Sequence, residues 1–204
     1  MTRIIFATLF ATALLNGTAR AAAPTAEQIV QWLPEDQVTE VEEIHPLTLK
    51  GGEQAYLASV NFPDAGRNFW AGYVLARPAL KEARVLEEFG GQYNGVTPGG
   101  GPLALIGSAG SGQGTSEATY SVVVFEGWAA KRLYSISESD NSGNCGYDGG
   151  LCEGSQVFLH FVPVIGSGAP YLSVTEVRYS STGDEDPAPK VTTRSELVRL
   201  LASD

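Results

Sequence analysis

The stretch EATYSVVVFE, residues 117–126, carries the strongest strand signal in the chain. Its four consecutive apolar residues, Val122 to Phe125, place apolar side chains on both faces of an extended segment. β-Branched and aromatic residues of this kind are typical of strands, and a strand that is apolar on both faces is covered on both sides. We therefore expect residues 117–126 to form a central strand of a sheet.

Outward from this strand, the chain alternates apolar and polar residues with a period of two, as in the series Gln54-Tyr56-Ala58-Val60-Phe62. The expected strands are residues 54–62, 69–76, 84–89, 103–106, 117–126, 133–137, 157–164 and 171–179. The segments between them are too short for the helical crossovers that parallel strands require. The sequence thus predicts a mostly β fold of about eight antiparallel strands, arranged as a meander or sandwich or as a propeller-like sheet.

Each end of the mature chain carries a helix-start pattern. Thr25 with Gln28 forms a capping box, and Thr193 with Glu196 repeats it near the C-terminus. Both are followed by apolar residues. We expect a short helix at each end, the second reached through an exposed, extended linker at residues 183–190.

The N-terminus has the layout of a secretory signal peptide. Arg3 precedes an apolar run from Ile4 to Leu15 and then small residues from Ala19 to Ala23. That run is shorter than the roughly 20 residues needed to span a bilayer, so we expect no membrane insertion. We predict a signal peptide at residues 1–21 and a single β-rich domain at residues 22–204, located in the periplasm or secreted.

The charge balance narrows the classes of partner. Among the 204 residues, 13 are Lys or Arg and 23 are Asp or Glu, which gives a formal net charge of −10. Binding to nucleic acid and to anionic lipid both depend on basic side chains. We therefore expect no nucleic-acid partner, and opposite charge makes a basic protein the natural partner.

Two cysteines, Cys145 and Cys152, lie seven residues apart. In an exported protein such a pair predicts a disulfide. The segment between them contains three glycines. Because the bond closes only a short loop, we expect it to clamp that loop locally and to contribute little to the stability of the whole fold. A zinc site needs more ligands of this kind than the chain supplies.

Motifs for catalysis are weak. The glycine-rich run at residues 107–114 leads into a predicted strand, whereas a phosphate loop leads into a helix, so we interpret it as a long hairpin loop. Ser116 lacks the second glycine of a nucleophile elbow, and His160 alternates with apolar residues as a sheet histidine does. The adjacent acids Glu42 and Glu43 would point to opposite faces of a strand. We predict no catalytic residue and no cofactor.

The segment after residue 139 is rich in oxygen ligands. Asp140, Ser142 and Asn144 have the spacing of the first ligands of a calcium-binding EF-hand loop, but Cys145 stands where glycine is required and Leu151 where a bidentate glutamate is required. A turn stabilised by Asp and Asn side chains explains the same residues. We predict no metal, and calcium binding remains an open alternative.

The clamped loop is the best candidate for an interaction surface, because a pre-ordered loop loses less entropy on binding. The predicted binding residues are Asp140, Asn141, Asn144, Tyr147, Asp148 and Glu153. The leading hypothesis is an exported, non-enzymatic binding protein; its most specific version is an inhibitor or immunity-type protein that binds a basic secreted enzyme through an acidic surface.

Two other classes of function remain open. The first is a periplasmic hydrolase that uses scattered carboxylates, which would show a cleft with two acids, one of them with a raised pKa. The second is an envelope structural protein, which would need a self-association surface; none of the expected strands shows an uncovered apolar edge. The sequence leaves the oligomeric state open.

Overall fold

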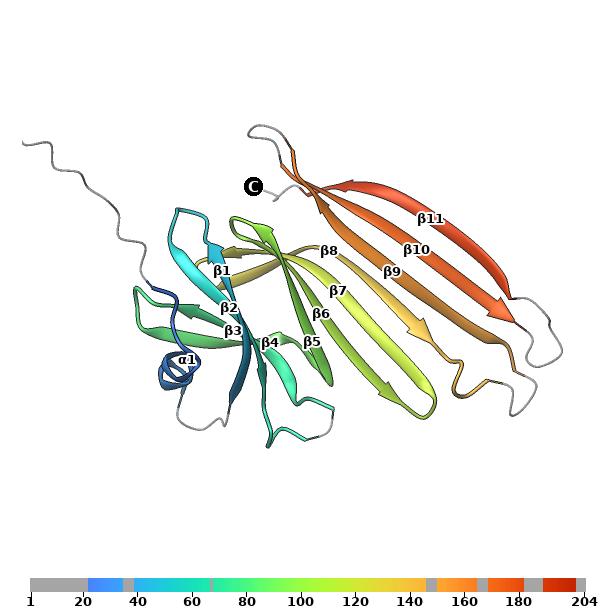
Figure 1. Ribbon diagram of the computed structural model, residues 1–204, viewed down its shortest axis with the longest axis horizontal. Coiled ribbons are helices and arrows are strands. Elements are labelled where there is room, and N and C mark those ends of the chain that lie inside the picture. The colour runs from blue at the N-terminus through green and yellow to red at the C-terminus, as the bar shows by residue number, and fades with distance from the viewer. Residues whose placement is uncertain are drawn as a thin grey trace, which may run out of the picture.

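The computed structural model describes residues 22–34, 39–66, 68–145, 150–164, 169–181 and 189–200. The expected signal peptide at residues 1–21 lies outside these residues, as does most of the expected linker. Figure 1 shows one short helix and two antiparallel sheets. The first sheet has the order β1-β2-β3-β4 and the second the order β11-β10-β9-β8-β7-β6-β5. The mostly β fold is confirmed, as two sheets that do not form a closed barrel.

The elements follow one another in a meander. They are α1 (Ala26–Trp32), β1 (Glu40–Thr48), β2 (Gln54–Asn61), β3 (Ala71–Arg77), β4 (Glu82–Gly91), β5 (Tyr93–Gly100), β6 (Leu103–Gly112), β7 (Thr115–Glu126), β8 (Ala129–Asp140), β9 (Cys152–Val162), β10 (Tyr171–Ser181) and β11 (Lys190–Arg199). Three of these strands, β1, β5 and β11, lie outside the eight that the sequence predicts.

The elements pack in layers, because the second sheet folds over between β8 and β9. α1 covers one face of β1–β4 (Figure 1), the other face of β1–β4 packs against β5–β8, and β9–β11 pack against the far side of β6–β8. β7 lies between two of these layers, because it is apolar on both faces. Val123 and Phe125 pack against the first sheet, whereas Val122 and Val124 pack against Leu172 of β10 and its neighbours. The central position predicted for residues 117–126 is therefore confirmed, with β6 and β8 as its neighbours.

Polar groups cross between the two sheets at one place. The hydroxyl of Tyr73, a fully buried residue of β3, accepts from the Gly95 N–H at 2.7 Å, and its one hydrogen is shared between the carbonyl oxygens of Gly107 and Gly95. The amide of Asn94 donates to the carbonyl oxygens of Val60 and Gly72 at 3.0 and 3.1 Å. These bonds fix β5 against the first sheet.

The first expected helix is confirmed. Thr25 accepts a hydrogen bond from the Gln28 N–H, and the Gln28 side chain accepts one from the Thr25 N–H, so both halves of the capping box are present. Ile29 then buries completely against the outer face of the first sheet.

The expected C-terminal helix is wrong. Residues Lys190–Arg199 form β11, which pairs with β10 in an unbroken register from Tyr171 opposite Arg199 to Ser180 opposite Lys190. Of the expected linker at residues 183–190, residues 183–188 lie outside the described residues, and Lys190 begins the strand. Ten cross-strand pairs outweigh a local capping pattern, which contributes about 1 kcal/mol.

The expected long glycine loop is also wrong. β6 continues through Gly107 to Gly112, and the connection to β7 is a tight turn at Gln113 and Gly114, both with positive φ (52° and 78°). A two-residue turn with positive φ at both positions matches the twist of an antiparallel hairpin. Gly114 also lies against the backbone of Gly143, where a Cβ would approach within 2.5 Å. The β6–β7 turn therefore abuts the β8–β9 connection.

Candidate functional site

The cysteine-clamped turn connects β8 to β9. Cys145 and Cys152 form a disulfide with their Cα atoms 5.0 Å apart, which confirms the predicted bond. Asn141 closes the same turn without the cysteines: its side-chain oxygen accepts from the Glu153 N–H at 2.7 Å and its amide donates to the Leu151 carbonyl at 3.1 Å. The turn is thus stabilised in two independent ways, by the disulfide and by the side-chain hydrogen bonds of Asn141.

Asp140 stabilises the start of this turn. Its carboxylate accepts from the Ser142 N–H at 2.7 Å, and the hydroxyl of Tyr179 on β10 also donates to it. These hydrogen bonds, those from Ser142 first, hold the pKa of Asp140 below its ordinary value of 3.8. The carboxylate is therefore kept ionised, the opposite of what a general acid requires.

β8 and β9 separate just beyond this turn. Among the described residues, their ladder consists of Asp140 opposite Gly154. Side chains bridge the rest of the gap: the Ser139 N–H donates to the Ser155 hydroxyl at 3.2 Å, and the Val157 N–H donates to Glu138 Oε2 at 2.7 Å. The separation opens a hollow on each side of the two strands.

One hollow, which we call the tyrosine–carboxylate cavity, has a volume of about 430 Å³. Its characteristic residues are Tyr93, Glu117, Tyr120, Glu138, Asp140 and Tyr179. None of the described residues that line it is Lys or Arg. The cavity therefore combines three carboxyl-bearing side chains with three aromatic rings.

Hydrogen bonds fix several of these side chains. The Tyr120 hydroxyl donates to Glu138 Oε1 at 2.9 Å while Glu138 Oε2 holds the backbone of β9. Burial, followed by the bond to Glu138, raises the pKa of Tyr120 to about 12. Burial and the bond to Asp140 likewise raise the pKa of Tyr179. Both phenols therefore remain neutral donors at physiological pH.

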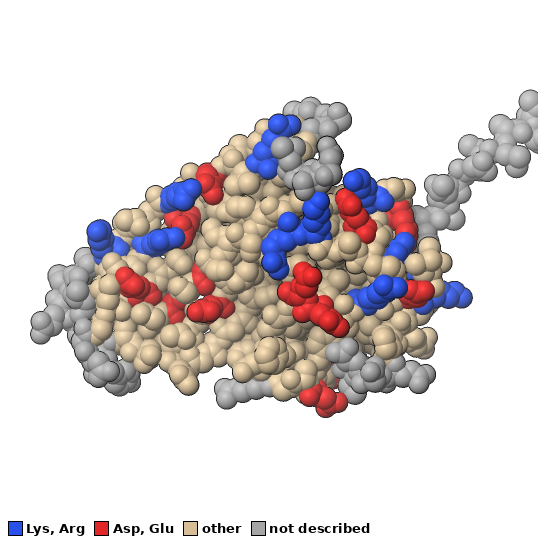
Figure 2. Space-filling view, turned by 180° about the vertical axis from the view of Figure 1, so that it is seen from behind, with Lys and Arg blue, Asp and Glu red and all other residues tan. Residues whose placement is uncertain are grey.

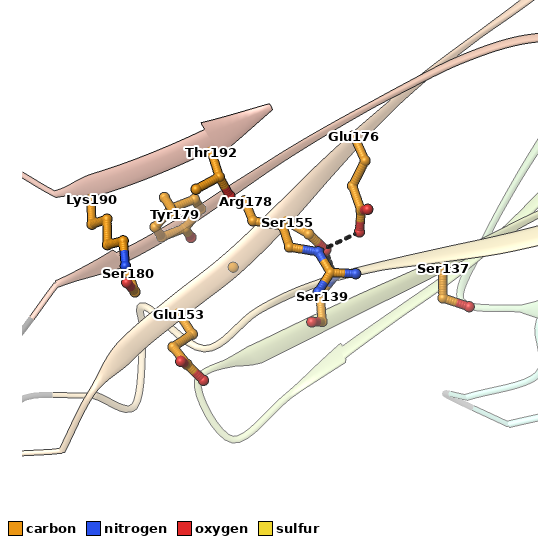
Figure 3. A pocket seen from close by; sticks show the side chains of 11 residues that line it. Ser137, Ser139, Glu153, Ser155, Glu176, Arg178, Tyr179, Ser180, Lys190 and Thr192 are labelled. Atoms are coloured by element: carbon orange, nitrogen blue, oxygen red, sulfur yellow. Dashed lines mark hydrogen bonds and ion pairs between the residues drawn. The ribbon is translucent and has the colours of Figure 1, made fainter. Parts of the chain in front are cut away.

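The opposite hollow is a groove of mixed charge, shown in Figure 3. It is lined by Glu153, Glu176, Arg178 and Lys190 together with serines and a threonine, and its volume is about 480 Å³. Arg178 Nε forms an ion pair with Glu176 Oε1 at 2.7 Å, drawn as the dashed line. Because two acidic and two basic side chains line this groove, and Arg178 and Glu176 already form an ion pair, it offers less unbalanced charge to a ligand than the tyrosine–carboxylate cavity does.

Mixed charge also characterises the wider surface. Figure 2 shows Lys and Arg interspersed with Asp and Glu over the face seen from behind. Among the described residues, Arg77 forms a bidentate contact with Glu53 (2.8 and 2.6 Å), and Lys50 forms a hydrogen bond with Glu126. The tyrosine–carboxylate cavity differs from this mixed surface, because its lining holds three acidic residues and no Lys or Arg.

The structure places the predicted binding residues at several different sites. Asp140 lines the tyrosine–carboxylate cavity. Asn141 is occupied within the turn, and Asn144 is exposed beside Gly114. Glu153 is exposed and lines the mixed-charge groove. Tyr147 and Asp148 lie outside the described residues, so their role stays a prediction.

Sequence reasoning missed Tyr93, Glu117, Tyr120, Glu138 and Tyr179. These five residues come from four strands, β5, β7, β8 and β10. Period-two alternation places Glu138 on the same face of β8 as Asp140, and that signal was available. No signal in the sequence indicates that the other strands converge on this cavity, because their convergence depends on where β9–β11 diverge from β8.

Metal ligands do not gather in the described part of the chain: no group of three or more His, Cys, Asp or Glu side chains there could hold an ion. No helix in those residues is long and apolar enough to cross a bilayer. The disulfide indicates a non-reducing compartment, extracellular or periplasmic. The chain matches no protein-family model, and no curated protein or solved structure matches it either.

Proposed function

We propose that this protein is an exported, non-enzymatic binding protein whose tyrosine–carboxylate cavity receives a cationic side chain of a basic protein partner. The observation that carries the proposal is the lining of that cavity, in which Glu117, Glu138 and Asp140 stand among three tyrosines. The partner class follows from this chemistry, and the specific version is a basic secreted enzyme that the protein inhibits or confers immunity against.

The chemistry of the cavity suits an ammonium or guanidinium group. Carboxylates form charge-assisted hydrogen bonds with such groups, and a ring within about 6 Å adds a cation–π attraction. Tyr93 is 58% exposed and available at the rim. Asp140 is kept ionised by its hydrogen bonds, so its negative charge is present throughout the physiological pH range.

The surroundings of the cavity are ordered before a partner arrives. The disulfide and the two side-chain bonds of Asn141 hold the turn that carries Asp140. Pre-ordering lowers the entropy cost of association. The net charge of −10 adds a long-range attraction for a basic protein, which speeds the encounter and weakens as salt rises.

Export is part of the same proposal. A disulfide persists in a non-reducing compartment, and residues 1–21 have the pattern of a signal peptide. A basic secreted enzyme would be met in that compartment, in the periplasm or in the medium.

The first experiment is affinity capture from the cell envelope and from culture medium, with immobilised protein washed at low and high salt. Retained proteins are identified by mass spectrometry, and each is then titrated directly against the purified protein by calorimetry. The proposal expects a basic protein that is retained at low salt and released at high salt. Binding that is indifferent to salt would contradict it.

Two variants with the same charge change make the test specific. Glu117→Gln removes an exposed acid of the cavity, and Glu40→Gln removes an exposed acid of β1 in the other sheet. We expect Glu117→Gln to weaken binding about fivefold or more and Glu40→Gln to change it less than twofold. Equal effects of the two substitutions would show that general charge, not the cavity, binds the partner.

A further inference from the structure

β11 is an exposed edge strand. It is the terminal strand of the seven-stranded sheet, and it pairs along its other side with β10 over ten consecutive positions. Alternate N–H and C=O groups along its outer side therefore point away from the sheet. A long edge of this kind is a ready template for pairing with another strand.

The other sheet edges carry features that oppose such pairing. β1 has a register shift between Val41 and Glu43 and contains Pro46. The pairing of β4 with β3 has a shift between Gly72 and Val74, and β5 has a shift between Pro98 and Gly100. Bulges and prolines protect edges against association. β11 contains no proline, and its pairing with β10 shows no register shift.

We propose that a second copy of this chain binds along this edge, with the two β11 strands pairing antiparallel about a two-fold axis at Ser195. An axis perpendicular to the sheet places Arg194 opposite the partner's Glu196, and Glu196 opposite the partner's Arg194. Within one copy these side chains lie on the same face of β11 and form an ion pair at 2.7 Å. The Arg194 side chain is 74% exposed and the Glu196 side chain 38%, so both can reach across the edge.

Charge selects this register over its neighbours. A shift of the axis by one residue toward the N-terminus sets Arg194 opposite the partner's Arg194, and a shift the other way sets Glu196 opposite the partner's Glu196. Opposite charges directly across a pair of strands stabilise it and like charges destabilise it. The register centred on Ser195 therefore has two favourable charge pairs, whereas each neighbour has a repulsive pair at its centre.

The outer face of the layer is also suited to burial beside a second copy. Val191 is 56% exposed and Leu197 59% exposed, and both lie on the same face of β11. In the proposed register Leu197 lies opposite the partner's Thr193. The seven-stranded sheets of the two copies would join at β11 into one continuous sheet.

This interface is independent of the proposed function, because the residues that line the tyrosine–carboxylate cavity come from β5 to β10 and none of them belongs to β11. A dimer would carry two such cavities. Failure of either proposal leaves the other unchanged.

Cysteine cross-linking tests the interface and its register together. Ser195→Cys places two thiols across the two-fold axis, so mild oxidation should convert most of the protein into a covalent dimer. Thr193→Cys is the matched control, because its counterpart in the partner lies four residues along the strand, about 13 Å away, beyond the reach of a disulfide. No cross-link with Ser195→Cys, or equal cross-linking of both variants, would overturn the proposal.

Charge reversal provides a second readout by sedimentation over a concentration series. Arg194→Glu and Glu196→Arg should each raise the dissociation constant of the dimer about tenfold. The double variant R194E/E196R restores opposite charges and should restore the dimer. The pairing would be contradicted if the unmodified protein stayed monomeric at the highest concentrations. It would also be contradicted if the double variant dimerised as weakly as the single variants. Either result would indicate that the edge pairs with a strand of another protein.

Discussion

The ring of Tyr179 lies directly over Gly154, so close that a Cβ on the glycine would approach its Cζ and hydroxyl oxygen within 2.4 Å. This close approach lets the tyrosine of β10 reach across β9 to Asp140 of β8. One glycine thus allows a side chain to join three strands where β8 and β9 begin to separate.

Gly154→Ala should therefore lower the free energy of unfolding by about 1–3 kcal/mol, the usual cost of overpacking. Urea unfolding measures the loss. Gly112→Ala in β6 is the matched control, because a Cβ there has no atom within 4 Å, and it should change stability much less. Equal stability of the two variants would show that Tyr179 moves aside freely.

Asp140 should make stability depend on acid pH. Its pKa is lower in the folded chain than its ordinary value of 3.8, because of the bonds from Ser142 and Tyr179. The resulting stabilisation is complete above the ordinary pKa and is lost as the pH falls through the folded value. Asp140→Asn, which can still accept from the Ser142 N–H, should show a smaller loss of melting temperature between about pH 4 and pH 2. An unchanged acid profile would remove Asp140 as the cause.

Two tyrosines should titrate late at the alkaline end. Burial raises the pKa of Tyr73 and of Tyr120 to about 12 in each case, from an ordinary value of 10.0. A raised folded pKa means that stability is complete below pH 10 and declines as the pH rises toward 12. Ultraviolet titration of the folded protein should show late ionisation that diminishes in Tyr73→Phe and in Tyr120→Phe. Simultaneous ionisation of all tyrosines near pH 10 would contradict both shifts.

Loss of the disulfide should lower the free energy of unfolding without unfolding the protein. The bond closes a loop of eight residues, for which chain entropy gives about 2.5 kcal/mol. Because Asn141 closes the same turn through its own hydrogen bonds, the variant Cys145→Ser/Cys152→Ser should remain folded, with a lower melting temperature. Calorimetry with and without reductant provides the comparison. Unfolding of the serine variant would mean that the bond supports more than this turn.

The fold was predictable where sequence signals were local and strong. Residues 117–126 are apolar on both faces and lie centrally, and the capping box at Thr25 begins a helix as expected. The second capping-box pattern, at Thr193 and Glu196, does not begin a helix, because pairing with β10 stabilises residues 190–199 as a strand. β5 was missed because its glycines and Pro98 disfavour strands; bonds from Tyr73 and Asn94 hold it in place.

The candidate site was less predictable than the fold. Asp140 was identified because it adjoins the cysteine loop, and Glu138 shares its face by simple alternation. Tyr93 and Tyr179 are 86 positions apart in the numbering and line the same cavity because of the course of β9 and β10. That course depends on packing between Leu172, Val122 and their neighbours, which no local pattern encodes.

Glu138 is the side chain whose removal should disturb this arrangement most. One carboxylate oxygen accepts from Tyr120 on β7 and the other from the Val157 N–H on β9. Glu138→Ala leaves a partly buried backbone N–H without its partner, which costs about 1–3 kcal/mol, whereas Glu138→Gln keeps one acceptor and should cost less.

Hydrogen exchange provides the residue-level readout, because the Val157 amide should exchange faster in Glu138→Ala than in the unmodified chain. Glu117→Ala, an exposed acid on the same cavity, is the control for charge and should alter stability by about 0.5 kcal/mol or less. If Glu138→Ala and Glu117→Ala were equally stable, the gap between β8 and β9 would be held by Ser139 and Ser155 instead. The cavity would then owe its shape to the backbone and not to its acids.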